Sequence, residues 1–223
     1  MDIQTLRLFN CEFVTIELIE EIRDASQRFS RDTTVRARAY ETLMTDPNHK
    51  EILSRVRNGK DVLPEDIGNS LVRFLNYWGC RFPYNSIPAL IPALKLTADQ
   101  IMTSIGNMSL EMLQGNHLGC IVSVFETLCE VPHVGGTTAS KILSVIQPKT
   151  FMMWDAKIAN AYGFSQNEMG YFRFLMFTRN IIRKLREFEP PPIEMQLCIE
   201  NQSRGWEVPI AKILDEWNWK TVL

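Results

Sequence analysis

The chain has 223 residues, of which 45% are hydrophobic and 22% are charged. At roughly 150 residues per domain, this length predicts one medium-sized fold or two small lobes that share a core, and it excludes a long multidomain protein. The composition predicts a folded protein and excludes a disordered one. Because 24 Lys and Arg residues face 26 Asp and Glu residues, the net charge is only −2, so a polyanionic partner would have to be held by a local basic patch.

The cysteine pattern and the N-terminal segment indicate where the protein works. The five cysteines are odd in number and include no C-x-x-C pair, which predicts reduced thiols in the cytoplasm, or in the nucleus of a eukaryote. The segment 1–13 carries the acidic Asp2 and lacks the apolar core of a signal peptide, so we expect no secretion. The uncharged stretch 112–125 is too short and too polar to span a bilayer, and no membrane association is expected.

Strand signatures are scarce after the first fifteen residues, and helical patterns dominate the rest of the chain. Apolar residues recur at intervals of three and four positions, which predicts an all-α fold. The pattern includes a break at Asp46-Pro47, a helix that begins at Pro64, and a capping box at 97–100 that starts a new helix. The other expected helices cover about 15–29, 33–57, 118–129, 139–146, a stretch from about 156, and 168–187, and the run EPPP at 189–192 makes a stiff break before the tail.

The segment Val131–Leu143 carries the most informative pattern. It reads VPHVGGTTASKIL, a turn of the form apolar-Pro-x-apolar-Gly that opens a helix, and amphipathic helices are predicted on both sides. Asp155 follows within PKTFMMWDAKIANAYG, directly before another predicted helix. This combination resembles the helix-hairpin-helix superfamily of base-excision DNA glycosylases. Set against the endonuclease III pattern Leu-Pro-Gly-Val-Gly-x-Lys-Thr-Ala, Thr137 takes the place of the lysine, and Asp155 follows it by 18 residues.

The resemblance covers about 71–163 and implies a two-lobed, all-α HhH-GPD fold. Residues 1–223 would form one unit, in which 65–150 make the hairpin-bearing lobe and 1–64 together with 151–223 make the second lobe. The implied activity is that of a monofunctional DNA N-glycosylase, which flips a damaged or modified base out of DNA and excises it, leaving an abasic site. The implied partner is DNA, and we expect the protein to act as a monomer.

The hairpin suits phosphate binding for reasons that do not depend on the resemblance. A glycine turn that leads into a helix exposes unpaired N–H groups at the positive end of the helix dipole. Residues 131–154 contain no acid but include Lys141 and Lys149, and 171–186 adds five basic residues without an acid. We therefore expect the DNA strand to be held by the hairpin residues Val134, Gly135, Gly136, Thr137 and Thr138.

Asp155 is the expected catalytic residue. Cleavage of an N-glycosidic bond builds positive charge on the sugar, which a carboxylate stabilises, and the carboxylate can also orient the attacking water. An extruded base needs surfaces to stack on and polar groups that read its edge. By rough alignment, the resemblance assigns these roles to Asn76, Tyr77, Trp78 and Arg81.

The chain also departs from the family. Thr137 cannot form the Schiff base that bifunctional members make with their lysine, so hydrolysis by water is expected, with Lys141, one turn along the helix, as an alternative nucleophile. His133 replaces the first glycine of the hairpin. The iron–sulfur cysteines of endonuclease III are absent and the three histidines lack metal-ligand spacing, so no metal and no other cofactor is expected.

Three other functions stay open at the level of the sequence. A DNA-binding module could keep the hairpin without excising a base, and a related enzyme could hydrolyse a modified nucleoside. A glycosylase could also act on hypermodified bases of phage DNA in defence. The identity of the base depends on which side chains face the pocket, and motif spacing does not determine this.

Overall fold

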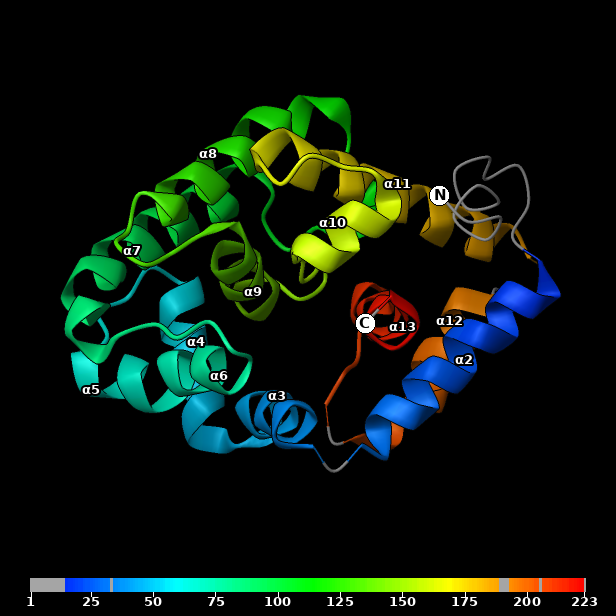
Figure 1. Cartoon of the computed structure of the whole chain (residues 1–223), viewed down its shortest axis with the longest axis horizontal. Coiled ribbons are helices and arrows are strands. Elements are labelled where there is room, and N and C mark those ends of the chain that lie inside the picture. Colours follow the sequence, from blue (N-terminus) through cyan, green and yellow to red (C-terminus); the bar gives the residue numbers. More distant parts are fainter. Residues whose placement is uncertain (1–14, 33, 189–192, 205, 223) are drawn as a thin grey trace.

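The computed structural model describes residues 15–32, 34–188, 193–204 and 206–222, and Figure 1 shows their path. Every regular element within these ranges is a helix, so the prediction of an all-α protein is confirmed. The strand signatures near the N-terminus and the break expected at 189–192 lie outside the described residues.

Helices of very different lengths make up the fold. The α-helices are α2 (Ile16–Ser30), α3 (Val35–Thr45), α4 (Pro47–Arg57), α5 (Pro64–Ile67), α6 (Arg73–Tyr77), α7 (Ile87–Ser104), α8 (Leu118–Cys129), α9 (Gly136–Ile146), α10 (Ala156–Tyr162), α11 (Glu168–Glu187), α12 (Ile193–Glu200) and α13 (Ile210–Val222). A π-helical turn, η1 (Gly68–Val72), joins α5 to α6. Short 3-10 turns lie at η2 (Tyr84–Ser86), η3 (Leu110–Met112), η4 (Gly115–His117) and η5 (Gln202–Arg204).

Side-chain caps define several helix ends. At the start of α2, the hydroxyl of Thr15 accepts a hydrogen bond from the backbone N–H of Leu18. Asp46 ends α3 and caps α4, where its carboxylate accepts from the N–H groups of Asn48 and His49. Because Asp46 has an extended backbone (φ −65°, ψ 127°), as expected for a residue before proline, the predicted break between these two helices is confirmed.

The expected helix start at 97–100 is wrong. Thr97 lies inside α7 and is fully buried, and its hydroxyl has no hydrogen-bond partner among the described residues. The helix continues through this point because it buries an apolar face that includes Leu90, Leu94 and Ile101. Packing of that face outweighs a local capping signal, which is worth about 1 kcal/mol.

Contacts between helices explain the arrangement in Figure 1. α13 packs along α2, and α7 packs along α8. α9, the second helix of the hairpin, contacts α4, α6 and α8. α3 also packs against α6, and α4 packs against α7. Both α3 and α4 belong to the expected second lobe, whereas α6 and α7 belong to the expected hairpin-bearing lobe. The hairpin is therefore supported by segments from both expected lobes, and the division into two lobes stays a prediction.

Gly170, in the first turn of α11, leaves no room for a side chain. A Cβ atom here would lie 1.8 Å from the backbone oxygen of Ser165 and 3.0 Å from the ring of Trp154. We expect Gly170→Ala to lower the free energy of unfolding by about 3 kcal/mol, because the backbone must shift. Gly119→Ala is the control, since a Cβ on that helical residue meets nothing within 4 Å and should stabilise the protein by up to about 1 kcal/mol. Urea denaturation measures both, and equal effects would contradict the prediction.

Candidate functional site

The segment between α8 and α9 forms a tight turn where the hairpin is expected. The backbone N–H of Val131 donates to the carbonyl of Leu128, and the N–H of Val134 donates to the carbonyl of Val131. His133 has a φ of 69°, in the left-handed region that favours glycine. The residue that stands in place of the first hairpin glycine therefore keeps a glycine-like backbone.

Within the described part of the chain, no side chain caps the first turn of α9. Gly135 precedes the helix with an extended backbone, and a Cβ at Gly136 would lie 3.1 Å from an aromatic ring of α8. Gly135 is exposed, Gly136 and Thr137 are partly exposed, and the side chains of Val134 and Thr138 are buried. Of the five expected clamp residues, Thr138 can therefore contribute only main-chain groups, and the N–H of Val134 is already bonded to Val131.

Three helices hold the loop 152–154, which directly precedes Asp155. Each helix supplies one buried side chain that bonds to the main chain of one loop residue. The pairs are Tyr171 of α11 with the carbonyl of Met152 (2.9 Å), Asp215 of α13 with the N–H of Met153 (3.0 Å), and Ser140 of α9 with the carbonyl and N–H of Trp154 (2.8 and 3.0 Å). The position of Asp155 is thus fixed by helices that are far apart in the sequence.

Asp155 is the N-cap of α10. Its Oδ1 accepts hydrogen bonds from the backbone N–H groups of Lys157 and Ile158, both at 2.9 Å. Its Oδ2 makes no hydrogen bond to any described residue, and the residue is partly exposed. One oxygen of the carboxylate is therefore held by the helix, while the other is available to a ligand.

A cavity of about 630 Å³ lies beside Asp155. The same cavity is lined by Thr137 and Lys141 of α9, and by Trp78 at the end of α6. The remaining lining includes residues that the sequence analysis missed, namely Arg36 of α3, Lys157 of α10, and Asp215, Trp219 and Lys220 of α13. The structure thus brings the candidate acid and the hairpin helix to one solvent-accessible site.

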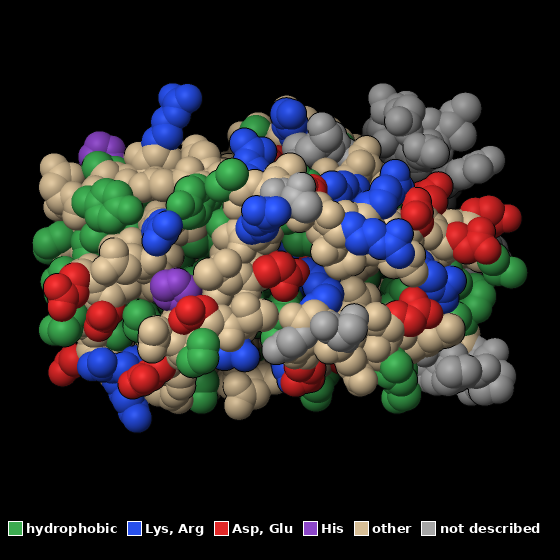
Figure 2. Space-filling view, turned by 90° about the horizontal axis from the view of Figure 1, so that it is seen from below, with side chains coloured by type: hydrophobic (Ala, Val, Ile, Leu, Met, Phe, Trp, Pro, Cys, Tyr) green, Lys and Arg blue, Asp and Glu red, His purple; other side chains and the backbone are tan. Residues whose placement is uncertain are grey.

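The charge around this cavity is locally positive. Four cationic residues and two carboxylates line it, and one of the cations, Lys220, pairs with Asp32 at 2.6 Å. Acidic and basic side chains are interspersed over the face of the molecule in Figure 2, as the nearly neutral net charge predicts. On this face, attraction of a polyanion would therefore depend on local groups and not on a broad basic surface.

Only one of the four expected base-pocket residues lines this cavity. Trp78 does so, and its indole N–H also donates to the carbonyl of Arg36 at 3.0 Å. The amide of Asn76 donates to the carbonyl of Phe82 at 3.0 Å and accepts from the N–H of the same residue at 2.6 Å, so it closes a loop instead.

Tyr77 and Arg81 also lie away from the cavity beside Asp155. Tyr77 lines a different cavity, and Arg81 is exposed with a φ of 53°. Successive helical residues point about 100° apart, so neighbours on one short helix cannot all face the same site.

Lys141 reaches the cavity with an engaged ammonium group. Its side chain is buried, and Nζ donates to the carbonyl of Trp78 at 2.9 Å. The same Nζ lies 3.8 Å from Sγ of Cys80 and 5.5 Å from the ring centroid of Trp78. Because Trp78 is the C-cap of α6, the ammonium lies at the carbonyl end of that helix, where a positive charge is favourable.

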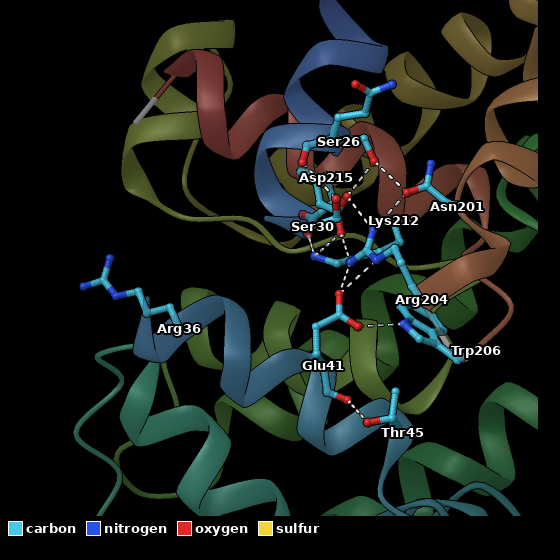
Figure 3. A network of polar contacts seen from close by, with 12 residues as sticks. Ser26, Ser30, Arg36, Glu41, Thr45, Asn201, Arg204, Trp206, Lys212 and Asp215 are labelled. Atoms are coloured by element: carbon cyan, nitrogen blue, oxygen red, sulfur yellow. Dashed lines mark hydrogen bonds and ion pairs between the residues drawn. The ribbon is translucent and has the colours of Figure 1, made fainter. Parts of the chain in front are cut away.

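A buried ionic network, shown in Figure 3, fixes α13 behind the cavity. The guanidinium of Arg204 pairs with Glu216 at 2.7 Å and also with Glu41 of α3. Glu41 accepts a further hydrogen bond from the indole of Trp206 at 3.0 Å, and Ser26 of α2 donates to Glu216 at 2.9 Å. Three helices and η5 therefore meet through polar groups, of which Glu216 and Arg204 are buried and Glu41 is partly exposed.

Lys212 connects this network to the cavity. Its Nζ pairs with Asp215 at 2.8 Å and lies 3.9 Å from Glu216. The same Nζ lies 4.1 Å from the ring centroid of Tyr40 and 4.8 Å from that of Phe29, which adds cation–π attraction in a desolvated place. Asp215, which holds the loop before Asp155, is thus held in turn by Lys212.

Burial raises the pKa of both carboxyl groups on α13, Asp215 and Glu216, and the nearby Lys212 opposes the rise in each case. The folded state therefore binds these protons more tightly than the unfolded chain. By linkage, this contribution to stability is present at low pH and is lost as pH rises from the ordinary Asp value of 3.8 through the raised pKa.

α11 uses several of its basic side chains to hold the segment around η3. Arg179 and Arg183 donate to main-chain carbonyls there, at 2.8 and 3.0 Å. Arg186 pairs with Glu111 and with Glu194, each at 2.6 Å. These three guanidinium groups are bonded within the protein. They therefore add less to phosphate binding than the run of five basic residues in 171–186 suggests.

The described residues contain neither a metal-binding cluster nor a membrane-spanning helix. Among these residues, no group of three or more His, Cys, Asp and Glu side chains is placed to hold a metal ion. No helix in the described ranges combines the length and the apolar character that crossing a membrane requires.

Comparison with known proteins identifies no relative. The chain matches no protein-family model, no curated protein and no solved structure. The resemblance to the helix-hairpin-helix glycosylases therefore rests on the residues and the geometry of this chain alone.

The buried network makes a prediction about stability. Glu216→Ala leaves the charges of Arg204 and Lys212 without their shared partner, and we expect a loss of about 3 to 5 kcal/mol in the free energy of unfolding. The control is Glu200→Ala, because Glu200 pairs with Arg23 near the surface, where both side chains are 29% exposed. This second variant should lose less than about 1 kcal/mol. Chemical denaturation gives both values, and a small effect of Glu216→Ala would count against a structural role for the network.

Proposed function

We propose that this protein is a monofunctional DNA N-glycosylase with the two-lobed HhH-GPD fold. One observation carries the proposal: a single cavity is lined by Asp155, by the hairpin residue Thr137 and by Lys141 one turn further along. The proposed partner is DNA, bound by a monomer in the cytoplasm or in the nucleus. The enzyme would hydrolyse the bond between a damaged or modified base and its sugar.

The uncapped start of α9 supports the phosphate-binding part of this proposal. Main-chain N–H groups in the first turn of a helix lack intrahelical partners, and here no side chain replaces them. The oxygen atoms of a DNA phosphate would accept from these groups beside the positive end of the helix dipole. Gly135 is exposed and has no side chain, so a phosphate could approach its backbone closely.

The carboxylate of Asp155 supports the chemistry. With Oδ1 held by two N–H groups, Oδ2 would face the sugar of an everted nucleotide. As the C1′–N bond breaks, positive charge develops on the sugar and the carboxylate stabilises it. The C1′–N bond breaks and its electron pair stays with the base. The oxygen of a water molecule that Asp155 orients bonds to C1′, and one proton of this water passes through the carboxylate to the base, which leaves protonated.

The walls of the cavity support base eversion. Trp78 and Trp219 both line it, with ring centroids 5.7 Å apart, and they offer aromatic surface to an extruded base. A volume of about 630 Å³ lies within the range of sites that enclose small molecules. A base together with its sugar would fit, and so would a base with a bulky modification.

A DNA-binding module without excision is the second candidate function. It is favoured by the hydrogen bonds of Asp155, because a helix cap is a common structural role for this residue type. In that case the carboxylate would only cap α10, and no reaction would take place in the cavity. Hydrolysis of a modified nucleoside would use the same cavity without the DNA strand.

Mass spectrometry of released bases tests the proposal directly. The substrates are duplexes with assorted lesions, modified phage DNA, and free modified nucleosides. Release of a base from a duplex supports the glycosylase, release from phage DNA points to defence, and release only from free nucleosides indicates a nucleoside hydrolase. Tight binding of a duplex without any released base would support the binding module.

Asp155→Asn separates catalysis from capping. Asn caps helices about as well as Asp, so the variant should stay within about 1 kcal/mol of the original stability. Base release should fall by about 100-fold or more, because the neutral amide cannot stabilise the developing charge. The rate of base release in single-turnover conditions is the measurement.

The matched control is Asp46→Asn, which makes the same change at the N-cap of α4, outside the lining of the cavity beside Asp155. It should leave base release unchanged. If both variants released the base at the original rate, Asp155 would not be the catalytic residue.

Lys141 generates a separate prediction about strand cleavage. Its ammonium is bonded to the carbonyl of Trp78, so we expect no Schiff base with the sugar. Borohydride should trap no covalent complex on a substrate from which the base is released. A trapped complex that disappears in Lys141→Ala would show that the enzyme is bifunctional.

A further inference from the structure

A second cavity, of about 270 Å³, lies where α3, α4, η1 and α6 meet. It shares no lining residue with the larger cavity beside Asp155. At roughly 30 Å³ per water molecule, it has room for about nine waters. This is enough room for one aromatic ring with a small substituent.

The body of this cavity is apolar. Leu43 and Phe74 are among its lining residues, and each is 2% exposed. Val35 and Tyr77 also line it and remain 60% and 40% exposed, although both are large and apolar. A ligand with an apolar body would cover these surfaces and remove them from water.

The charged groups around the cavity all have the same sign. Arg38 and Arg73 line it, and no carboxylate of the described residues does. The guanidinium of Arg73 donates to the hydroxyl of Tyr77 at 3.1 and 3.2 Å and lies 5.5 Å from the centroid of its ring, so it is held at the cavity. Arg38 is exposed and forms no ion pair with the described residues. Guanidinium groups in this setting bind carboxylates well.

Two further features mark the place. Asn69 and Ser70 of the π-helical turn η1 line the cavity, and π-turns are uncommon and frequently occur at functional sites. The ring of His49 lines the cavity too, and its Nδ1 is buried with no hydrogen-bond partner among the described residues. A buried polar atom without a partner is costly, so it needs a reason to persist.

The geometry points to this cavity as a binding site for a small organic acid, in which one aromatic or branched aliphatic group carries a carboxylate. The apolar group packs against Leu43 and Phe74. The carboxylate is bound by Arg38, with Arg73 beside it. This site is independent of the proposed glycosylase activity, because none of its residues lines the cavity beside Asp155.

Isothermal titration calorimetry of the full chain with benzoate tests the site. Benzoate combines one ring with one carboxylate and matches the cavity in size. We expect saturable binding of one benzoate per chain. Benzamide, which has the same shape without the charge, should bind at least about tenfold more weakly, because it loses the charge-assisted hydrogen bonds.

Variants on α3 separate the two cavities. Arg38→Gln should weaken benzoate about tenfold and leave benzamide unchanged. Thr42→Leu adds an apolar side chain at the exposed edge of the cavity and should abolish binding of both compounds while the protein stays folded, as thermal melting will show. Arg36→Gln is the matched control, since Arg36 lies on the same helix but lines the larger cavity, and it should bind benzoate normally.

Two results would overturn the inference. One is a failure of the binding test: either no saturable binding at millimolar benzoate, or binding that stays unchanged in both Arg38→Gln and Thr42→Leu. The other is equal competition by inorganic phosphate that Thr42→Leu does not affect, which would identify the arginines as a simple anion contact on the surface. Neither result would bear on base release, which is measured separately.

Discussion

The hydrogen bond from the N–H of Met153 to the carboxylate of Asp215 joins groups that are 62 positions apart, and the candidate site depends on it. A buried carboxylate is costly unless it is paired, and Lys212 supplies the pairing charge. Lys212 is itself desolvated and lies against the rings of Tyr40 and Phe29. Helices α2, α3 and α13 therefore all contribute to the surroundings of the group that holds the loop before the candidate acid.

Buried ion pairs contribute little net stability compared with well-packed apolar groups, so stability alone does not account for this network. Directional bonds do, however, distinguish one alignment of helices from others that bury similar apolar area. Arg204 bonds to Glu41 of α3 and to Glu216 of α13, and a shift of α13 by one residue would break its second bond. We infer that the network selects the register of α13, and through Asp215 the position of the loop.

Local signals predicted much of the fold, and they failed where packing decides. The break at Asp46 and the bounds of α8 and α11 follow from capping and periodicity within short windows. The capping box at 97–100 failed because the apolar face of α7 continues through it. The place of Asp155 beside the hairpin helix was predictable because hairpin, loop and next helix are contiguous in the chain, while its catalytic role stays a prediction. The role of Asp215 in holding the loop was not predictable, because no spacing in the sequence relates it to Asp155. The base-pocket residues around Trp78 were assigned by alignment alone, and the sequence does not determine which side chains of a short helix face the cavity.

The position of Lys141 on α9, one turn after Thr137, has a consequence for the proposed reaction. At the position of Thr137, an amine would stand free in the cavity, whereas the amine of Lys141 is bonded to the carbonyl end of α6. An amine that is bonded to this carbonyl does not point toward a sugar beside Asp155, so it is poorly placed to act as the nucleophile. Lys141 can still add to the positive field that attracts a polyanion. Water is then the remaining nucleophile for the proposed reaction, and a different class of enzyme must cleave the strand at the abasic site.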